Sequence, residues 1–480
     1  MSFVSDLNQA GGRVYEVGGT VRDRLLGIAH KDRDLLVTGL ALDALLKLLR
    51  RHGEVFTVGK SFGVLKFHPK EDPDTEYDIA LPRKEVSTGV GHKDFQVDYD
   101  PSLPVEIDLS RRDFTVNAMA IEAASGKLID PFGGEKDLKD RMLRMVFDRA
   151  FEEDPLRLLR AVQFAARFRL TIEPATFEAM KKHADLIRTV SPERISEEFR
   201  KLFLADKPSA GFVVMRDSGL LQPLLPELFE NVGVEQGNKA HNDDVFLHTM
   251  KVLDASRKDD AIPFAGDLEL MLAALFHDVG KARTQRFDPE KNRMTFYGHQ
   301  ILSKRMARKR MNALKMTTIG VNPENVAHLV EHHMFQTKAH FNDRSIRRFI
   351  NKVGPEHILK LVDLRIADNR GGKYPEGIKG VLRLRRKIQD ELDRKTPFGV
   401  KDLAVNGTDL MGLGIPEGPE IGRVLKELVD YVLDDPEINT KEALLDLSKK
   451  ILAGEAPPRK KEEKDPFAPD EDGCVEEDQE

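Results

Sequence analysis

The spacing of apolar residues changes once along the chain, near residue 150. Before this point, short apolar runs alternate with turn signals, at 14–17, 34–37, 64–67 and 77–81. Runs of this length between turn residues predict a mixed β-sheet with helices packed on it. From Asp154 onward, apolar residues recur every three or four positions and β-branched runs become scarce, which predicts an all-α remainder.

Composition shifts and turn-rich stretches divide the chain further. They fall near Phe147, within 233–242, at Gly371 and Gly372, and after Pro457. The fold class expected is an α+β head followed by an all-α neck, a helical body and a helical tail. We expect the head at 1–146, the neck at 147–232, the body at 233–372, the helical tail at 373–456 and a disordered acidic tail at 457–480.

Bulk composition excludes several classes of protein. The 480 residues are 40% hydrophobic and 32% charged, and this length suits roughly three or four domains. No apolar run reaches the roughly 18 residues of a membrane helix, and residues 1–10 lack the blocks of a secretory signal. The single cysteine, Cys474, excludes an internal disulfide and a cysteine metal site. We therefore expect a cytoplasmic protein without membrane association.

The net charge of −6 conceals basic surfaces. Residues 456–480 account for all of it, with ten acidic against four basic residues. The neutral remainder contains lysine and arginine clusters at 304–310, 344–348 and 383–386. Such clusters could line a phosphate backbone, and solvated helix faces give the same pattern.

A glycine pair and two acidic residues mark the start of the head. Residues 17–27 read VGGTVRDRLLG, a turn where backbone N–H groups can approach a triphosphate. Asp32 and Asp34 follow, and strand alternation turns both carboxylates to one face. Such a pair suits Mg²⁺ beside substrate phosphates, where two metals would activate a hydroxyl and stabilise leaving pyrophosphate. Alone, each motif is also explained by an ordinary turn or a solvated strand end; together they favour a metal site.

These motifs resemble the signature of the class II tRNA nucleotidyltransferases, or CCA-adding enzymes, and of the related bacterial poly(A) polymerases. Further blocks agree, with GKSFGV at 59–64, RRDFTVNA at 111–118 and DPFGG at 130–134. The resemblance extends from about Tyr15 to Leu452. It implies a polymerase-β-like nucleotidyltransferase head.

The resemblance also implies roles for single residues of the head. The triphosphate would be contacted by Gly19 and Arg22, Mg²⁺ would be held by Asp32 and Asp34, and the nucleotide would be contacted by Arg112. Asp78 is a candidate for a third carboxylate.

The block EDPLRLLR at 153–160 matches the nucleotide-selecting helix of this family. Asp154 before Pro155 predicts an N-cap with proline at the first helical position. Arg157 and Arg160, three residues apart, lie near one helical face and are the expected nucleotide-binding arginines. Without the preceding motifs, an ordinary cap with surface arginines would explain the block.

The hydrogen-bonding edges of the bases indicate how this helix would select nucleotides. Cytosine and adenine both present an amino donor beside a ring-nitrogen acceptor, which a carboxylate and a guanidinium complement. Uracil and guanine offer a ring N–H there, which would face Arg157 donor to donor. Asp154 and Arg157 are thus predicted to act as a protein template for C and A. The chain departs from the family at Gln163, where many relatives carry a further arginine.

Histidines concentrate in the predicted body, with nine of fourteen between His241 and His357. Their order resembles the HD phosphohydrolase pattern, whose four core ligands would be His248, His277, Asp278 and Asp368. His299 and either His332 or His333 could complete a second metal position. Such ligands suit transition metals such as Ni²⁺, Mn²⁺, Co²⁺ or Fe²⁺, which make a bound water nucleophilic near neutral pH.

The resemblance implies phosphatase or cyclic phosphodiesterase activity of this site on RNA 3′ ends. A degraded site that only holds the helical body together is the alternative. Farther on, VNGTDLMGLGIP at 405–416 resembles the family's C-terminal RNA-binding turn and helices. Its glycines would allow close approach to phosphates, or they are plain helix caps.

The function expected is template-independent addition or repair of the 3′-terminal CCA of tRNA from CTP and ATP. Related alternatives are CC addition, A addition and poly(A) synthesis; poly(A) polymerases usually carry a more basic motif at 59–64. The choice between CC and CCA depends on a flexible loop of the head, for which 83–100 is long enough. In an alternative of another class, the head only binds RNA and the HD site alone is catalytic. The intact acidic pair and Asp154 with Arg157 argue against it.

Overall fold

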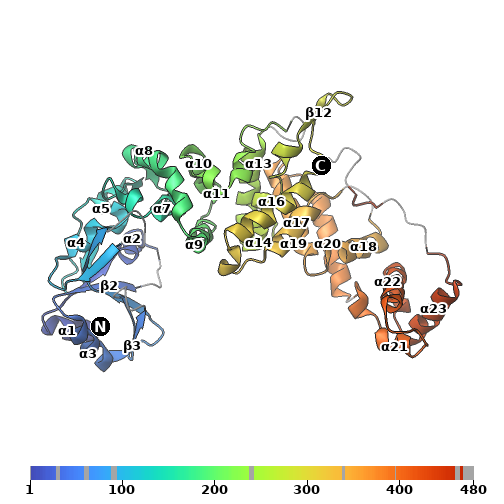
Figure 1. The fold of residues 1–480 in the computed structure, drawn as a ribbon, viewed down its shortest axis with the longest axis horizontal. Coiled ribbons are helices and arrows are strands. Elements are labelled where there is room, and N and C mark those ends of the chain that lie inside the picture. Colours follow the sequence, from blue (N-terminus) through green and yellow to red (C-terminus); the bar gives the residue numbers. More distant parts are fainter. Residues whose placement is uncertain are drawn as a thin grey trace. The chain divides into compact units, whose positions relative to one another are not determined.

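A seven-stranded sheet organises the first part of the chain (Figure 1). The computed structural model describes residues 2–28, 33–58, 64–87, 95–236, 243–337, 341–394, 396–459 and 465–468. The strands are β1 (Arg13–Val17), β2 (Arg33–Thr38), β3 (Gly53–Val58), β4 (Val64–Pro69), β5 (Tyr77–Ala80), β8 (Ala120–Glu122) and β9 (Leu128–Ile129). They lie in the order β3-β4-β5-β2-β1-β8-β9, and of these pairs only β2 with β5 is parallel. The four apolar runs predicted as strands are confirmed as β1, β2, β4 and β5.

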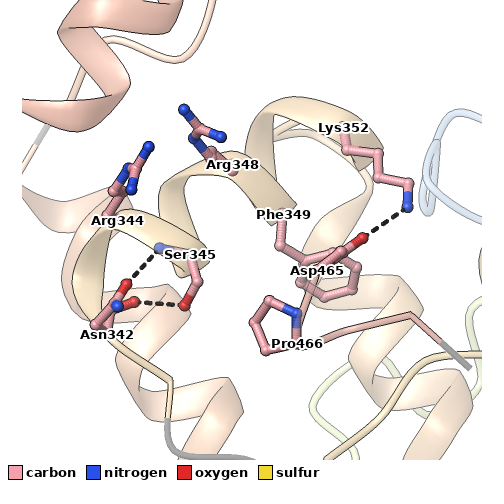
Figure 2. A pocket seen from close by; sticks show the side chains of 8 residues that line it. All are labelled: Asn342, Arg344, Ser345, Arg348, Phe349, Lys352, Asp465 and Pro466. Carbon is pink, nitrogen blue, oxygen red and sulfur yellow. Dashed lines mark hydrogen bonds and ion pairs between the residues drawn. The ribbon is translucent and has the colours of Figure 1, made fainter. Parts of the chain in front are cut away.

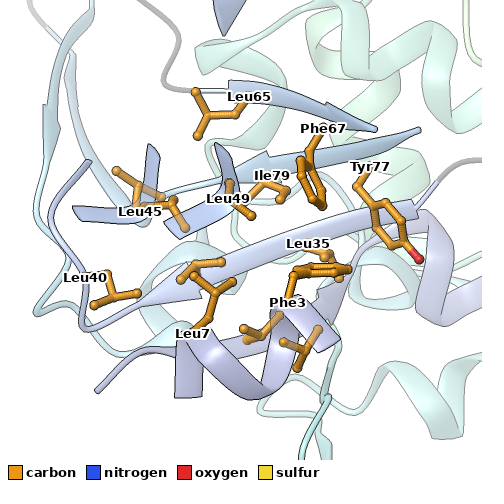
Figure 3. Close-up of a cluster of buried hydrophobic side chains, with 14 residues drawn as sticks. Phe3, Leu7, Leu35, Leu40, Leu45, Leu49, Leu65, Phe67, Tyr77 and Ile79 are labelled. Carbon is orange, nitrogen blue, oxygen red and sulfur yellow. The ribbon is translucent and has the colours of Figure 1, made fainter. Parts of the chain in front are cut away.

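Both faces of the central strand β2 are buried from Leu35 onward, because successive residues of this strand face opposite cores. Leu35 and Val37 belong to one cluster, with Phe3 and Leu7 of α1 (Ser2–Gln9) and the leucines of α3 (Leu42–His52), as Figure 3 shows. Leu36 faces the other cluster, under α4 (Val105–Ser110) and the short helix η1 (Thr115–Asn117). The two layers of helix hold the strand ends that carry the acidic residues.

Helices complete the first compact unit, Met1–Leu224. Its further elements are α2 (Gly19–Leu25), α5 (Gly134–Lys139), β10 (Met142–Leu143), α6 (Ala150–Glu153), α7 (Leu156–Phe168), β11 (Thr171–Ile172), α8 (Pro174–His183), η2 (Ala184–Thr189), α9 (Pro192–Leu202), α10 (Ser209–Asp217) and α11 (Leu221–Leu224). Helix α7 packs against both α9 and α10. Its face toward them is apolar, with Leu158, Ala161 and Val162 fully buried.

The segment 83–100, expected to be one flexible loop, contains a pair of strands. β6 (Arg83–Ser87) and β7 (Phe95–Tyr99) pair antiparallel, from Arg83 opposite Tyr99 to Ser87 opposite Phe95. Backbone hydrogen bonds of this ladder join the two ends of the segment, so 83–87 and 95–99 are paired strands. The role expected for the segment in choosing between CC and CCA addition stays a prediction. Residues 88–94 between the strands lie outside the described residues.

The second unit, Leu225–Glu480, is built mainly of helices. Its elements are α12 (Pro226–Phe229), α13 (Val245–Arg257), α14 (Leu268–Phe276), α15 (Lys281–Thr284), β12 (Arg286–Asp288), β13 (Arg293–Thr295), α16 (His299–Ala313), η3 (Met316–Ile319), α17 (Pro323–His332), α18 (Asp343–Val353), α19 (Ile358–Gly371), α20 (Lys379–Asp393), η4 (Val400–Asp402), α21 (Gly407–Met411), α22 (Pro419–Asp434), η5 (Pro436–Ile438) and α23 (Lys441–Ala453). Helices α13, α14, α17 and α19 pack on one another, and α21 to α23 enclose a separate apolar core around Leu428. Among the described helices, none combines the length and apolar character needed to cross a membrane.

The prediction of an all-α remainder is wrong at two places. β11 pairs parallel with β10, and β12 forms a hairpin with β13. In the hairpin, Asn292 adopts a positive φ of 49°. Asp288, Pro289 and Asn292 are turn residues whose local signal is outweighed by the helical spacing on either side.

The expectation of a disordered tail over 457–480 is wrong for residues 465–468. Phe467 is only 3% exposed and packs against α18. The tail is charged on average, but one buried aromatic ring is enough to fix this short segment. Residues 460–464 and 469–480 lie outside the described residues.

Candidate active site and metal centre

At the first glycine of the turn between β1 and α2, a guanidinium fills the space that a side chain would need. Gly18 has a φ of 66°, and a Cβ there would collide with the NH1 atom of Arg112. Asp108 holds Arg112 in place, with 3.1 Å between its Oδ2 and the arginine NH2. Thr20 accepts a 3.0 Å hydrogen bond from the backbone N–H of Asp34. The predicted triphosphate turn, Arg112 and the start of β2 are therefore adjacent.

Acidic side chains from two strands meet beside this turn. In the parallel pair of β2 and β5, Asp34 is directly opposite Asp78, so both side chains point to the same face. Lys66 of β4 is opposite Asp78 in turn, and its Nζ lies 3.3 Å from the Asp78 Oδ1. Asp32 lies outside the described residues. Oxygen ligands at this strand edge fit a hard divalent cation, with Lys66 as a neighbouring positive charge.

A buried chain of polar groups joins α2 to α7. Arg22 donates to the Oδ1 of Asn117 at 2.7 Å, and the Nδ2 of Asn117 donates to the Oδ1 of Asp113 at 2.9 Å. The Nε and NH2 atoms of Arg160 each lie 2.7 Å from the Oδ2 of Asp113. Two predicted site residues, Arg22 and Arg160, are thus connected through two residues to which the sequence assigned no role.

The ionisation of Asp113 is set by these contacts. Burial alone would raise its pKa, but Arg160, Asn117 and the backbone N–H of Phe114 lower the pKa below its usual range. Burial likewise opposes the charge of Arg160, whereas Asp113 raises its pKa. The pair is therefore charged, and each ion compensates the other in the interior.

Replacing Asp113 with alanine should lower the free energy of unfolding by about 2–4 kcal/mol, because three donors would lose their shared acceptor. These donors are the Asn117 amide, the Phe114 N–H and the guanidinium of Arg160, which is 31% exposed and would keep only Glu198 at 3.9 Å. Urea unfolding of the full chain measures this loss. Asp206→Ala is a matched control, since Asp206 is 59% exposed and its pair with Arg169 should contribute less than about 1 kcal/mol. Equal effects of the two substitutions would contradict a structural role of Asp113.

The two residues of the predicted base template lie at the start of α7. Asp154 has extended backbone, and its Oδ1 accepts a 3.2 Å hydrogen bond from Leu156 N–H, which is the capping role predicted. Its Oδ2 lies 2.9 Å from the NH2 of Arg194. Arg157 donates to the backbone oxygens of Arg111 and Ala150, at 2.8 and 3.2 Å. Both template side chains are thus fixed in position by their surroundings.

Six side chains of the second unit converge on one buried place. His248 comes from α13, His277 and Asp278 follow α14, His299 begins α16, His333 follows α17 and Asp368 lies on α19. One group contains His248, His277 and Asp368, and another contains Asp278, His299 and His333, each with ligand atoms within 4.8 Å of one another. The four predicted core ligands are therefore brought together.

Asp278 lies between the two groups. Its Oδ2 is 3.1 Å from the Nε2 of His277, and its Oδ1 is 3.2 Å from the Nε2 of His299. The Oδ1 of Asp368 is 3.0 Å from the Nε2 of His248. A carboxylate with one oxygen toward each group is suited to bridging two metal ions.

Backbone carbonyls orient three of these imidazoles. The Nδ1 atoms of His277, His299 and His333 donate to carbonyl oxygens three residues earlier, at 2.7, 2.8 and 2.7 Å. Their Nε2 atoms therefore face the centre, and that of His277 makes no hydrogen bond within the described part of the chain. Burial, His299 and His277 lower the pKa of His333 to about 3, so its ring is neutral at pH 7, the form that binds metals. The donor set fits one or two transition-metal ions.

Two cations surround the carboxylates. The Nζ of Lys281 lies 2.7 Å from the Oδ2 of Asp278, and the NH1 of Arg365 lies 3.0 Å from the Oδ2 of Asp368. Burial would raise the pKa of both carboxyls, but His277 for Asp278, and His248 and Arg365 for Asp368, hold it well below the usual range. Both residues are thus ionised and ready to act as ligands.

The structure decides between the two adjacent histidines. His333 belongs to the centre, whereas His332 packs against His328, with ring centroids 4.4 Å apart and the rings tilted by 40°, and lies near Glu331. Neighbouring residues at a helix end point about 100° apart, so only one of them can face the centre.

Some residues of these sites escaped the sequence analysis. Asp113 and Asn117 lie inside the RRDFTVNA block, but their partner Arg160 is far along the chain. Arg194 carries no local signal that links it to Asp154. Lys281 follows Asp278 by three residues, a helical spacing that could have identified the pair.

Two glycines of the C-terminal motif at 405–416, Gly407 and Gly412, lie at the two ends of α21. The side chain of Asn406 accepts hydrogen bonds from Thr408 and Asp409 at the start of α21, and Gly412 ends that helix. Several basic residues proposed to face phosphates are also paired internally, among them Arg310 with Glu227 and Arg385 with Asp363.

Comparison with protein families defines the class. Residues 14–144 match the family model described as "Poly A polymerase head domain", residues 169–231 match "Probable RNA and SrmB- binding site of polymerase A", and residues 245–370 match "HD domain". The chain thus combines a polymerase-type head with an HD domain.

Similarity to curated proteins narrows the class to a family. The multifunctional CCA protein of Actinobacillus pleuropneumoniae is 39% identical over 315 residues, which cover 64% of this chain and 72% of that protein. The multifunctional CCA protein of Xanthomonas campestris pv. campestris is 35% identical over 434 residues, or 86% of this chain and 96% of that protein. This chain belongs to the family of the multifunctional CCA proteins.

Solved structures show the same fold. The Bacillus stearothermophilus CCA-adding enzyme in complex with CTP has a TM-score of 0.68 at 22% identity, covering 94% of this chain and 98% of that chain. The Thermotoga maritima CCA-adding enzyme complexed with tRNA has a TM-score of 0.55 at 21% identity, covering 94% of each chain. The predicted polymerase-β-like head followed by a helical body is therefore confirmed.

Proposed function

We propose that this protein adds or repairs the 3′-terminal CCA of tRNA from CTP and ATP, in the cytoplasm. The observation that carries the proposal is the pairing of Asp34 with Asp78 beside the glycine turn, in a chain of the multifunctional CCA protein family. In this proposal the head at 1–146 is catalytic and the neck at 147–232 selects the nucleotide. The segments 233–372 and 373–456 are the HD domain and an RNA-binding tail.

Each group of the head has a role in nucleotidyl transfer. Asp32, Asp34 and Asp78 hold Mg²⁺, and Gly19 and Arg112 contact the triphosphate and nucleotide. When bound there, Mg²⁺ supplies activation of the RNA 3′-hydroxyl and stabilisation of the leaving pyrophosphate. Arg22, which is 6% exposed, contributes to the triphosphate side chiefly by bracing α2 against Asn117.

The bases are selected by Asp154 and Arg157. Each oxygen of a carboxylate can accept more than one hydrogen bond, so Asp154 can receive the amino group of C or A while keeping its bonds to Leu156 and Arg194. Arg160 holds α7 against Asp113 and thereby fixes the direction of Arg157. A pyrimidine or purine with a ring N–H would leave buried donors unpaired.

Asp154→Asn should lower kcat/KM for CTP and ATP by about a hundredfold and narrow the discrimination against UTP, since an amide N–H₂ would oppose the amino group of the base. Single-nucleotide incorporation with each of the four triphosphates measures this. The exposed Asp185→Asn on η2 is the control. Unchanged discrimination in Asp154→Asn would contradict the template.

The HD centre supports a second activity. We propose that it hydrolyses phosphate esters at RNA 3′ ends with a transition metal such as Ni²⁺ or Mn²⁺. When bound, the metal supplies a nucleophilic water near neutral pH. The position of Asp278 between two histidine groups and the inward orientation of three Nε2 atoms support this activity.

The test of the main proposal is direct. The purified protein and Mg²⁺ are incubated with tRNA lacking its last three nucleotides, with CTP and ATP supplied separately and together. Growth by CCA with both nucleotides is expected, and EDTA should stop it. Arrest after CC, a long A tail, or no growth would replace the proposal by a CC-adding enzyme, a poly(A) polymerase, or a chain in which only the HD centre is catalytic.

A further inference from the structure

The C-terminal segment 465–468 is clamped between two aromatic rings of the second unit. The ring of Phe467 stacks on Phe341 and on Phe349, with centroids 4.5 and 4.1 Å apart and interplanar angles of 5° and 9°. Gln336 N–H donates to the backbone oxygen of Phe467 at 3.3 Å. A ring that is 3% exposed and stacked on both sides is a specific contact.

Residues 457–459, which precede this segment, are also fixed by contacts with α22. The hydroxyl of Tyr431, on α22, donates to the backbone oxygen of Pro457 at 2.7 Å, and Arg459 pairs with Asp430. At the docked segment, the Nζ of Lys352 lies 3.3 Å from the Oδ2 of Asp465 (Figure 2). The segment therefore places an acidic residue against a basic residue of α18.

The surface beside it is a stripe of cations. Arg344, Arg348 and Lys352 follow one another at intervals of four residues along α18, a stripe about 12 Å long. Together with Asn342 and Ser345 they line a cavity of about 250 Å³, of which Asp465 and Pro466 form one side (Figure 2). Asp434 lies 2.5 Å from Arg344 and 2.9 Å from Arg348, so one carboxylate is shared by two guanidiniums. Arg344 and Arg348 are 17% and 26% exposed and Lys352 is 57% exposed, so the stripe is most open at Lys352. Three cations beside the single carboxylate of Asp434 leave a positive excess when Asp465 is not docked.

The charge of the tail complements this stripe. After Ala468 the sequence continues with seven acidic residues and no basic residue. Polyanionic RNA and an acidic peptide require the same cationic partner, and they repel each other when both are near it. Among the basic clusters at 304–310, 344–348 and 383–386, the cluster at 344–348 borders this cavity.

We propose that the α18 stripe binds the phosphate backbone of RNA and that the C-terminal segment, latched by Phe467, competes with RNA for it. The tail would thus be a built-in competitor that weakens RNA binding and speeds release. This inference rests on the proposed function only in taking RNA as the ligand.

The test measures the affinity of the protein for RNA in the absence of CTP and ATP. Fluorescence anisotropy with labelled tRNA lacking CCA is measured for the full-length protein and for Phe467→Ala, at fixed salt. If the tail occupies the stripe about 80% of the time, Phe467→Ala should bind RNA about fivefold more tightly. Phe287→Ala, which removes a 57% exposed ring from the same unit, is the matched control and should not change the affinity. Thermal unfolding checks that each variant is folded.

Two further experiments distinguish the role of the α18 cations from the role of Phe467. Adding Arg348→Gln and Lys352→Gln to Phe467→Ala should abolish the gain. A peptide of residues 463–480 added to Phe467→Ala should displace RNA, whereas the same peptide with alanine at 467 should not. Equal or weaker binding by folded Phe467→Ala, a gain that survives loss of the two cations, or no RNA binding by any variant would overturn the proposal. Loss of CCA synthesis with the fivefold difference intact would overturn only the proposed function.

Discussion

Asp34→Ala should reduce nucleotide incorporation at least about a thousandfold while leaving hydrolysis by the HD centre unchanged. Asp34 and Asp78 are opposite each other on neighbouring strands, and loss of one carboxylate removes a ligand that no other described residue at that register position replaces. The remaining charge cannot hold the metal at the reacting phosphate. Incorporation of CMP into tRNA lacking CCA measures the loss.

The control for this variant is Asp43→Ala. Asp43 lies exposed in the first turn of α3, in the same unit, and its removal should leave the rate within twofold. Asp32→Ala should match Asp34→Ala, because the two carboxylates were predicted to share one metal site. A variant at Asp34 that keeps more than a tenth of the wild-type rate would exclude it as a metal ligand.

His277→Ala should abolish hydrolysis of a 2′,3′-cyclic nucleotide in the presence of Ni²⁺ or Mn²⁺ and leave CCA synthesis intact. His277 is 1% exposed, and its Nε2 lies 3.1 Å from the Oδ2 of Asp278 and 3.6 Å from the Oδ1 of Asp368. Its removal takes a ligand from one metal position and disturbs the carboxylate shared with the other. Metal content by mass spectrometry should fall along with the activity.

The adjacent histidine that faces away from the centre gives the sharpest control here. His332→Ala should retain hydrolysis and metal content, whereas His333→Ala should lose both, although the two residues are adjacent in the sequence. Equal loss of CCA synthesis and hydrolysis in His277→Ala and Asp34→Ala would contradict two separate sites. Full hydrolysis in His277→Ala would mean that the HD centre only supports the fold.

The elements of the head could be predicted because each strand carries its own alternating signal. The pairing of Asp34 with Asp78 could not, since it depends on β5 lying beside β2 in parallel register, which no local pattern specifies. The contact of Arg160 with Asp113 likewise joins residues 47 positions apart. Motif resemblance supplied the residues of the head, and packing decided which of them touch.

In the second unit, too, sequence motifs identified candidate residues and packing decided which of them meet. The order of histidines predicted the four core ligands, but the choice of His333 over His332 is made by the direction in which the end of α17 turns. The C-terminal segment shows that an average composition can mispredict the structure of a few residues. Its acidic composition predicts disorder, whereas the single ring of Phe467 is buried because it stacks on both Phe341 and Phe349.

Gly18 limits which substitutions the glycine turn can accept. Gly18 is constrained twice, by its positive φ and by the guanidinium of Arg112 in the space of a Cβ. A substitution at 18 would displace Arg112, and a smaller residue at 112 would still leave the strained backbone. A side chain at position 18 is therefore opposed twice, by backbone strain and by the need to move Arg112 away from Asp108, and we expect this position of the turn to tolerate substitution least.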